Sequence, residues 1–143
     1  MWQRIQTLYL AISTLLIISL LFCNVVNIIG TDGHVEQVRY YDNIVYIVFI
    51  ISIISGNGFT LFSYKARTVQ MRLCIIEALI MTGFQIWIGV DYLKWMKTDE
   101  MVFSFTAVFP IISAILNVMA ARCIALDEAM VQASHRLRGG KRK

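Results

Sequence analysis

Glu77 is the one carboxylate that falls clearly inside a long apolar run of this sequence, so it is the first residue that could carry chemistry. A charge in hydrocarbon is costly and is usually paired or functional. Counting inward at about 1.5 Å per residue puts Asn57 and Asn117 near the same depth as Glu77. We therefore predict a polar layer in which Glu77 is hydrogen-bonded to Asn117 or Asn57 and is paired with Arg122 or Arg4. The predicted cluster consists of Arg4, Gln6, Asn57, Glu77, Asn117 and Arg122.

Two roles are open to Glu77. It could carry a proton or a cation in a small coupled transporter, or it could act as polar glue that holds the helices in register. No second buried acid accompanies it, since Asp91 belongs to the opposite face, and Gln85 alone would bridge the distance between them. This pattern favours glue over transport.

Signatures of enzymes and metal sites are missing from the sequence. It contains no GxSxG, no HExxH and no Walker-type glycine loop, and its two histidines are expected on opposite sides of a membrane. The cysteines form no CxxC pair and have no ligand spacing with His135. The sequence therefore predicts no catalytic residue, no cofactor and no metal site.

The composition is that of a membrane protein. Hydrophobic residues make up 58% of the 143 residues, against roughly 45–50% in ordinary soluble domains. Charged residues make up 15%, where about 25% is usual. The positive charges lie near chain ends and in one short loop, without an aromatic platform, so nucleic acid is not an expected partner.

Four apolar runs predict an all-α membrane protein that forms a single domain over 1–143. The expected spans are 5–24, 43–64, 70–94 and 101–122, and the short connections between them predict an up-and-down four-helix bundle. About 20 residues suffice to cross a hydrocarbon core of roughly 30 Å. The first run lacks a signal-peptide cleavage site and is therefore expected to be an uncleaved span. Pro110 is expected to kink the fourth span near mid-depth.

The segment from Asn24 to Asp42 is the only sizeable connection. Two β-prone runs flank Gly30-Thr31-Asp32-Gly33, which predicts a small periplasmic β-hairpin. An irregular loop is the alternative. An isolated hairpin is marginal in water, so we expect this one to lean on the helix ends or the headgroup layer.

The Lys and Arg residues predict the orientation. Ten of the 13 fall at the two termini, in the loop around Arg67 and at Arg122, whereas Arg39, Lys94 and Lys97 fall on the other side. Because cytoplasmic segments carry the excess of Lys and Arg, both termini are expected in the cytoplasm.

The tail, 123–143, reads as a cytoplasmic extension of the last helix. Leu126, Met130, Ala133 and Leu137 recur at helical spacing, which predicts an amphipathic helix. Docking to a partner protein, an anchor on anionic lipid and a solvated tail are the alternatives. The candidate contact residues are Asp127, Glu128, Arg136, Arg138, Lys141, Arg142 and Lys143.

Both ends of the chain resemble a known family. The resemblance lies in the opening from Gln3 to Leu10, in the motifs Phe109-Pro110-Ile111 and Leu116-Asn117, and in the closing stretch from Arg122 to Arg138. These parts are similar to those of an uncharacterised four-helix integral membrane protein family of Bacteroidetes, which is classed as a domain of unknown function. His135 departs from the acid expected in the closing motif. The resemblance implies an inner-membrane protein and brings no activity.

The sequence as a whole predicts a non-enzymatic accessory or scaffold subunit that packs against a larger membrane complex or against further copies of itself. The alternative is a small ion- or proton-coupled transporter that uses Glu77. Membrane lipids are expected contacts in both cases.

Overall fold

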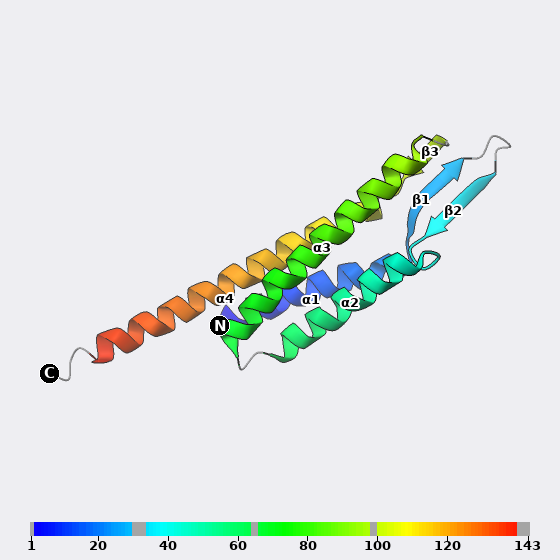
Figure 1. Cartoon of the computed structure of the whole chain (residues 1–143). Coiled ribbons are helices and arrows are strands. Elements are labelled where there is room, and N and C mark those ends of the chain that lie inside the picture. Colours follow the sequence, from blue (N-terminus) through cyan, green and yellow to red (C-terminus); the bar gives the residue numbers. More distant parts are fainter. Residues whose placement is uncertain (1, 30–33, 64–65, 98–99, 140–143) are drawn as a thin grey trace.

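The computed structural model describes residues 2–29, 34–63, 66–97 and 100–139. In this part of the chain four α-helices lie alongside one another, and a small sheet closes one end of the bundle (Figure 1). The elements in chain order are α1 (Trp2–Leu20), β1 (Asn24–Ile29), β2 (Val35–Arg39), α2 (Ile44–Phe62), α3 (Arg67–Trp95), β3 (Glu100–Phe103), the 3₁₀ turn η1 (Phe105–Val108) and α4 (Phe109–Gly139).

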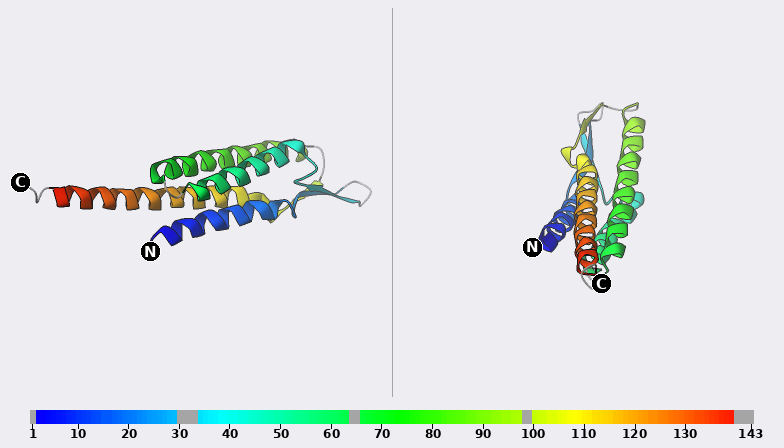
Figure 2. Two further views of the ribbon diagram at one scale, coloured as in Figure 1. Left: turned by 90° about the horizontal axis from the view of Figure 1, so that it is seen from below. Right: turned by 90° about the vertical axis from the view of Figure 1, so that its left-hand side faces the viewer.

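The bundle has two distinct ends. We call the end with the sheet the sheet end, and the opposite end, where α1 begins and the α2–α3 connection lies, the terminal end. The last part of α4 projects well beyond the other three helices at the terminal end (Figure 2). The up-and-down order expected from the short connections is therefore present.

Among the described residues, three helices are long and apolar enough to cross a membrane, namely Ile44–Phe62, Arg67–Trp95 and the combined helical stretch Phe105–Ser134. The 19 residues of α2 span about 28 Å, close to a hydrocarbon core of roughly 30 Å. The apolar part of α1, Ile5–Leu20, is shorter. The expected run to residue 24 is interrupted because the chain turns at Leu21 and enters β1 at Asn24.

The predicted hairpin is confirmed by the antiparallel pairing of β1 with β2, in which Val26 faces Val38 and Ile28 faces Glu36. Its expected turn, 30–33, lies outside the described residues. The sheet is anchored to the bundle, since Val25 and Val26 are fully buried in the main hydrophobic core. It leans on the helix ends as expected.

A third strand was not expected. β3 pairs antiparallel with the other edge of β1, so the strand order is β2-β1-β3. The prediction that the fourth span begins at Met101 was therefore wrong. β1 exposes an unpaired edge to the segment that follows α3, and pairing satisfies the backbone groups of both strands.

Pro110 does not kink a helix in its middle. It is the second residue of α4, directly after η1. Proline suits the first turn of a helix because its missing N–H would have no intrahelical acceptor there. The predicted mid-depth kink is replaced by a change from 3₁₀ to α geometry at the helix start.

The core runs along the bundle axis, and much of the outside is apolar. Tyr46, Ile50, Met81 and Phe84 are fully buried. Large apolar side chains remain exposed on every helix, including Leu15, Phe59, Leu79 and Ile115. Exposed apolar side chains on all four helices are what a lipid-facing exterior requires.

Candidate functional site: a polar layer inside the bundle and a charged terminal end

A chain of polar side chains crosses the interior of the bundle. Asn117 Nδ2 in α4 donates to Asn57 Oδ1 in α2 at 2.9 Å, and Asn57 Nδ2 lies 3.5 Å from Ser13 Oγ in α1. The Ser13 hydroxyl donates to the backbone carbonyl of Ser113, and the Ser113 hydroxyl donates to the backbone carbonyl of Ser13, each at 3.4 Å. All four side chains are fully buried. The layer therefore joins α1, α2 and α4 through hydrogen bonds that an apolar core could not provide.

Glu77 lies beside this layer on α3 and is only 5% exposed. Its Oε2 is buried without a hydrogen-bond partner among the described residues. The predicted hydrogen bond from Asn117 or Asn57 to Glu77 was wrong, because the Asn117 amide group donates to Asn57 and the Asn57 amide group is directed at Ser13. Met81, one turn further along α3, has its sulfur 3.8 Å from Asn117 Nδ2, which keeps Glu77 adjacent to the layer. We call Ser13, Asn57, Glu77, Ser113 and Asn117 the polar layer.

Gly56 makes room for Glu77. A Cβ atom added at position 56 would overlap the carboxyl group of Glu77, with even Oε2 only 2.9 Å away. The Gly56 carbonyl accepts a 2.9 Å hydrogen bond from Thr60 Oγ1 within α2. The close approach of α2 and α3 at this level therefore depends on glycine at position 56, the residue before Asn57.

The predicted ion pair of Glu77 does not form in the described part of the structure. Arg122 lies on an exposed face of α4, and the side chain of Arg4 lies outside the described residues. The ion pair that the described residues do form is Lys94–Asp91, at 3.0 Å, at the sheet end. Counting depth from Arg122 placed Asn117 at the height of Glu77 but could not tell that the Arg122 side chain lies on the outside of the bundle.

Gln6 takes a different role from the one expected. Its Nε2 donates to Asp127 Oδ2 at 2.6 Å, across 121 positions of sequence. The bond ties the start of α1 to α4 at the level where α4 leaves the bundle. Asp127, predicted as a partner contact, is therefore half-buried and engaged within the chain.

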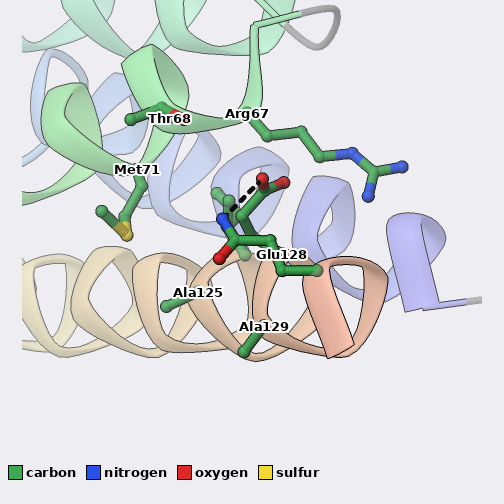
Figure 3. A pocket seen from close by; sticks show the side chains of 8 residues that line it. Arg67, Thr68, Met71, Ala125, Glu128 and Ala129 are labelled. Carbon is green, nitrogen blue, oxygen red and sulfur yellow. Dashed lines mark hydrogen bonds between the residues drawn. The ribbon is translucent and has the colours of Figure 1, made fainter. Parts of the chain in front are cut away.

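A cleft of about 310 Å³ lies between the start of α3 and the projecting part of α4 (Figure 3). Glu128, another predicted contact residue, lines it and accepts a 3.2 Å hydrogen bond from Gln132 Nε2. The side chains of Arg136 and Arg138, and all of residues 141–143, lie outside the described residues. The cleft is lined by Arg67, Thr68, Met71, Ile124, Ala125, Glu128, Ala129 and Gln132.

A second buried carboxylate sits at the sheet end. Asp91 is 8% exposed and accepts a hydrogen bond from Tyr46 at 2.9 Å as well as the ion pair from Lys94. The sequence placed Asp91 at the exit of a helix but gave no signal for Tyr46. From Glu77 to Asp91 the α3 backbone rises about 21 Å.

An aromatic cluster separates the two carboxylates. Phe84 contacts Tyr46, Tyr40 and Phe49, with ring centroids 5.2–6.5 Å apart. Phe84 and Tyr46 are fully buried. Tyr40 lies between β2 and α2, and burial raises the pKa of its hydroxyl to about 12.

No group of three or more His, Cys, Asp or Glu side chains gathers as a metal site within the described residues.

These features define a helical-bundle protein with an apolar exterior, a buried polar layer and three helices able to cross a membrane. The chain belongs to the DUF4293 family, a domain of unknown function, which matches residues 2–137. No curated protein and no solved structure matches the chain.

Proposed function

We propose that this chain is an integral protein of a bacterial inner membrane, from a member of the Bacteroidetes, with both termini in the cytoplasm. The apolar exterior of the bundle supports insertion. The orientation is supported by the basic residues, since Arg67, Arg72 and Arg122 lie toward the terminal end, whereas Arg39, Lys94 and Lys97 lie toward the sheet end. Basic residues gather on the cytoplasmic side of membrane proteins.

Its role is that of a non-enzymatic accessory or scaffold subunit of a larger membrane complex. The observation that carries this proposal is the projection of α4 past the bundle (Figure 2). Leu126 is 60% exposed and Met130 is 55% exposed, and both lie on this part of the helix. Side chains of this kind on an isolated helix outside the hydrocarbon core are suited to the surface of another protein.

The interior of the bundle supports a structural rather than a catalytic role. The hydrogen bonds among Ser13, Asn57 and Asn117 join helices, and such bonds hold membrane bundles in one register. Asp91 is likewise held by Tyr46 and Lys94. A bundle whose own polar groups lock it together offers a stable platform for the projecting helix.

Replacing the apolar face of the projection should release the partner. In native membranes cross-linked before mild detergent extraction, the wild-type chain is expected to carry a stoichiometric partner protein. The double substitution Leu126→Ser/Met130→Ser should reduce the cross-linked product about tenfold, because burying large apolar side chains supplies most of such a contact. The amount of cross-linked product, quantified by mass spectrometry, is the measurement.

The matched control is Ala125→Ser/Ala129→Ser, which changes two exposed alanines of the same helix segment on the side that lines the cleft. It should leave the cross-linked product unchanged. The accessory role would be refuted if the wild-type chain were recovered without any cross-linked partner, or if Leu126→Ser/Met130→Ser left the amount of cross-linked product unchanged. A product containing only further copies of this chain would identify the partner as a homo-oligomer.

A small proton- or cation-coupled transporter is the second candidate, and the unpartnered Glu77 Oε2 favours it. Against it stands the aromatic cluster around Phe84, which fills the core between Glu77 and Asp91. A relay across the membrane would have to pass this cluster, where Gln85 and the Tyr46 hydroxyl are polar but neither is a carboxylate that could carry a charge onward.

Flux measurements separate the two candidates. If the protein is a transporter, vesicles containing it should show a proton- or cation-coupled flux that Glu77→Gln reduces at least about a hundredfold, because the substitution removes the carboxylate that would carry the proton or cation. Glu36→Gln, at an exposed position of β2, is the control and should leave the flux intact. Under the accessory proposal neither the wild type nor the variants carry a specific flux.

A further inference from the structure

A groove runs along the outside of the bundle between α3 and α4. Its volume is about 500 Å³. Ala78 and Ala114 are almost fully buried there, and their small side chains leave the groove hollow. Larger exposed side chains flank them, among them Leu79 and Ile115. The groove is lined by Ile75, Ala78, Leu79, Thr82, Ile111, Ala114, Ile115, Val118, Met119 and Arg122.

The groove offers no free polar group along its length. Thr82 is its one uncharged polar side chain, and its hydroxyl already donates to the Ala78 carbonyl at 2.8 Å. The occupant must therefore be apolar over this length, since a polar group would be buried there without a partner.

One end of the groove is positively charged. Arg122 lines it directly, at the end that faces the terminal end of the bundle. Ile75, Leu79 and Thr82 lie on one face of α3 and line the groove. Arg72 is three positions before Ile75, so it lies on the same face of α3 at the charged end of the groove. Both arginines are exposed, and within the described residues neither forms an ion pair, the one such pair being Lys94–Asp91.

The length of the groove selects its occupant. From Ile111 to Arg122 the α4 backbone rises about 16 Å, which is half of a hydrocarbon core of roughly 30 Å. A transmembrane helix of a partner, or of a second copy, would need a track across the whole core. An acyl chain in one leaflet needs only this half.

We propose that the groove between α3 and α4 binds one acyl chain of an anionic phospholipid, and that Arg72 and Arg122 bind the phosphate of its headgroup. The site rests on the proposed membrane insertion and orientation, which put both arginines at the level of the inner-leaflet headgroups. Guanidinium groups suit phosphate because their fork of N–H donors matches its oxygens. Basic pockets between transmembrane helices bind acidic lipid headgroups in this way.

Native mass spectrometry of the detergent-solubilised, delipidated full chain tests the site. The probes are phosphatidylglycerol and phosphatidylcholine with identical acyl chains, and inorganic phosphate. The wild type is expected to retain one phosphatidylglycerol per chain about tenfold better than phosphatidylcholine. Inorganic phosphate at millimolar concentration should not displace it, because the acyl chain contributes to binding.

Two variants probe the two parts of the site. Arg72→Gln/Arg122→Gln should weaken phosphatidylglycerol retention about 30-fold, since each arginine near a charged lipid surface contributes several-fold in affinity. Ala114→Leu keeps both guanidinium groups but fills the groove floor, and it should weaken retention of both lipids about tenfold. Arg39→Gln/Lys97→Gln removes the same charge at the sheet end and should leave retention unchanged.

Several outcomes would overturn the lipid site. These are equal retention of the two lipids by the wild type, equal effects of the two charge-removing double variants, full displacement by inorganic phosphate, or unchanged retention in Ala114→Leu. A cross-link from Leu79 to a partner helix in native membranes would assign the groove to protein instead. Extraction of the chain from membranes by alkaline carbonate would refute the proposed insertion itself, which is a separate result.

Discussion

Gly56→Ala is expected to lower the stability of the bundle by about 2 kcal/mol, the usual cost of overpacking a closed interior. The new Cβ atom would overlap the carboxyl group of Glu77. Glu77 cannot simply swing into solvent, since it is 5% exposed and enclosed by the bundle. α2 and α3 must therefore separate at this level. The thermal midpoint of the detergent-solubilised protein, followed by circular dichroism, is the measurement.

Gly58 provides the matched control. It lies two residues further along α2, and a Cβ atom there would meet nothing within 4 Å. Gly58→Ala should therefore leave the midpoint unchanged or raise it slightly, because alanine is the better helix former. A second test restores the space, since Gly56→Ala/Glu77→Ala should unfold close to Glu77→Ala alone. Equal midpoints for the two glycine variants would show that Glu77 does not occupy the position described.

Asn117→Leu is expected to destabilise the bundle by about 1–2 kcal/mol, the range for losing a hydrogen bond between helices and leaving its partner buried. The substitution removes the donor to Asn57 Oδ1, and Asn57 is fully buried. Asn57 Oδ1 would then be buried without a hydrogen-bond donor among the described side chains. Thermal unfolding in the same detergent is the measurement.

A double-mutant cycle separates the hydrogen bond from changes in packing. Asn57→Leu should cost a similar amount, since it leaves Asn117 without its acceptor. Asn57→Leu/Asn117→Leu removes both polar groups, so it should be clearly less destabilised than the sum of the two single variants. Strict additivity would show that the amides do not act as a pair.

The polar layer and the groove have complementary roles in this picture. The layer faces inward and fixes how the four helices meet. The groove and the projecting part of α4 face outward, and we propose that they bind lipid and protein respectively. Substitutions in the layer should therefore change stability, whereas substitutions of Arg72, Arg122, Leu126 or Met130 should change binding with little effect on the midpoint.

The sequence by itself determined the helices and their polarity. Apolar runs of membrane-spanning length are local properties, so α2, α3 and α4 could be recognised from composition and spacing. The hairpin of β1 and β2 followed from β-prone runs around a turn. The low exposure of Glu77 followed from its place in an apolar run, and the common depth of Asn57 and Asn117 followed from the helical rise.

Only the tertiary structure decided which groups meet. The position of a residue along a helix gives its depth but not its direction around the helix axis. Counting residues therefore could not show that Asn117 donates a hydrogen bond to Asn57, or that the Glu77 carboxyl group packs against Gly56. For the same reason it could not show that Arg122 faces outward. The four residues of β3 carry no signal of their own, since they become a strand through the free edge of β1.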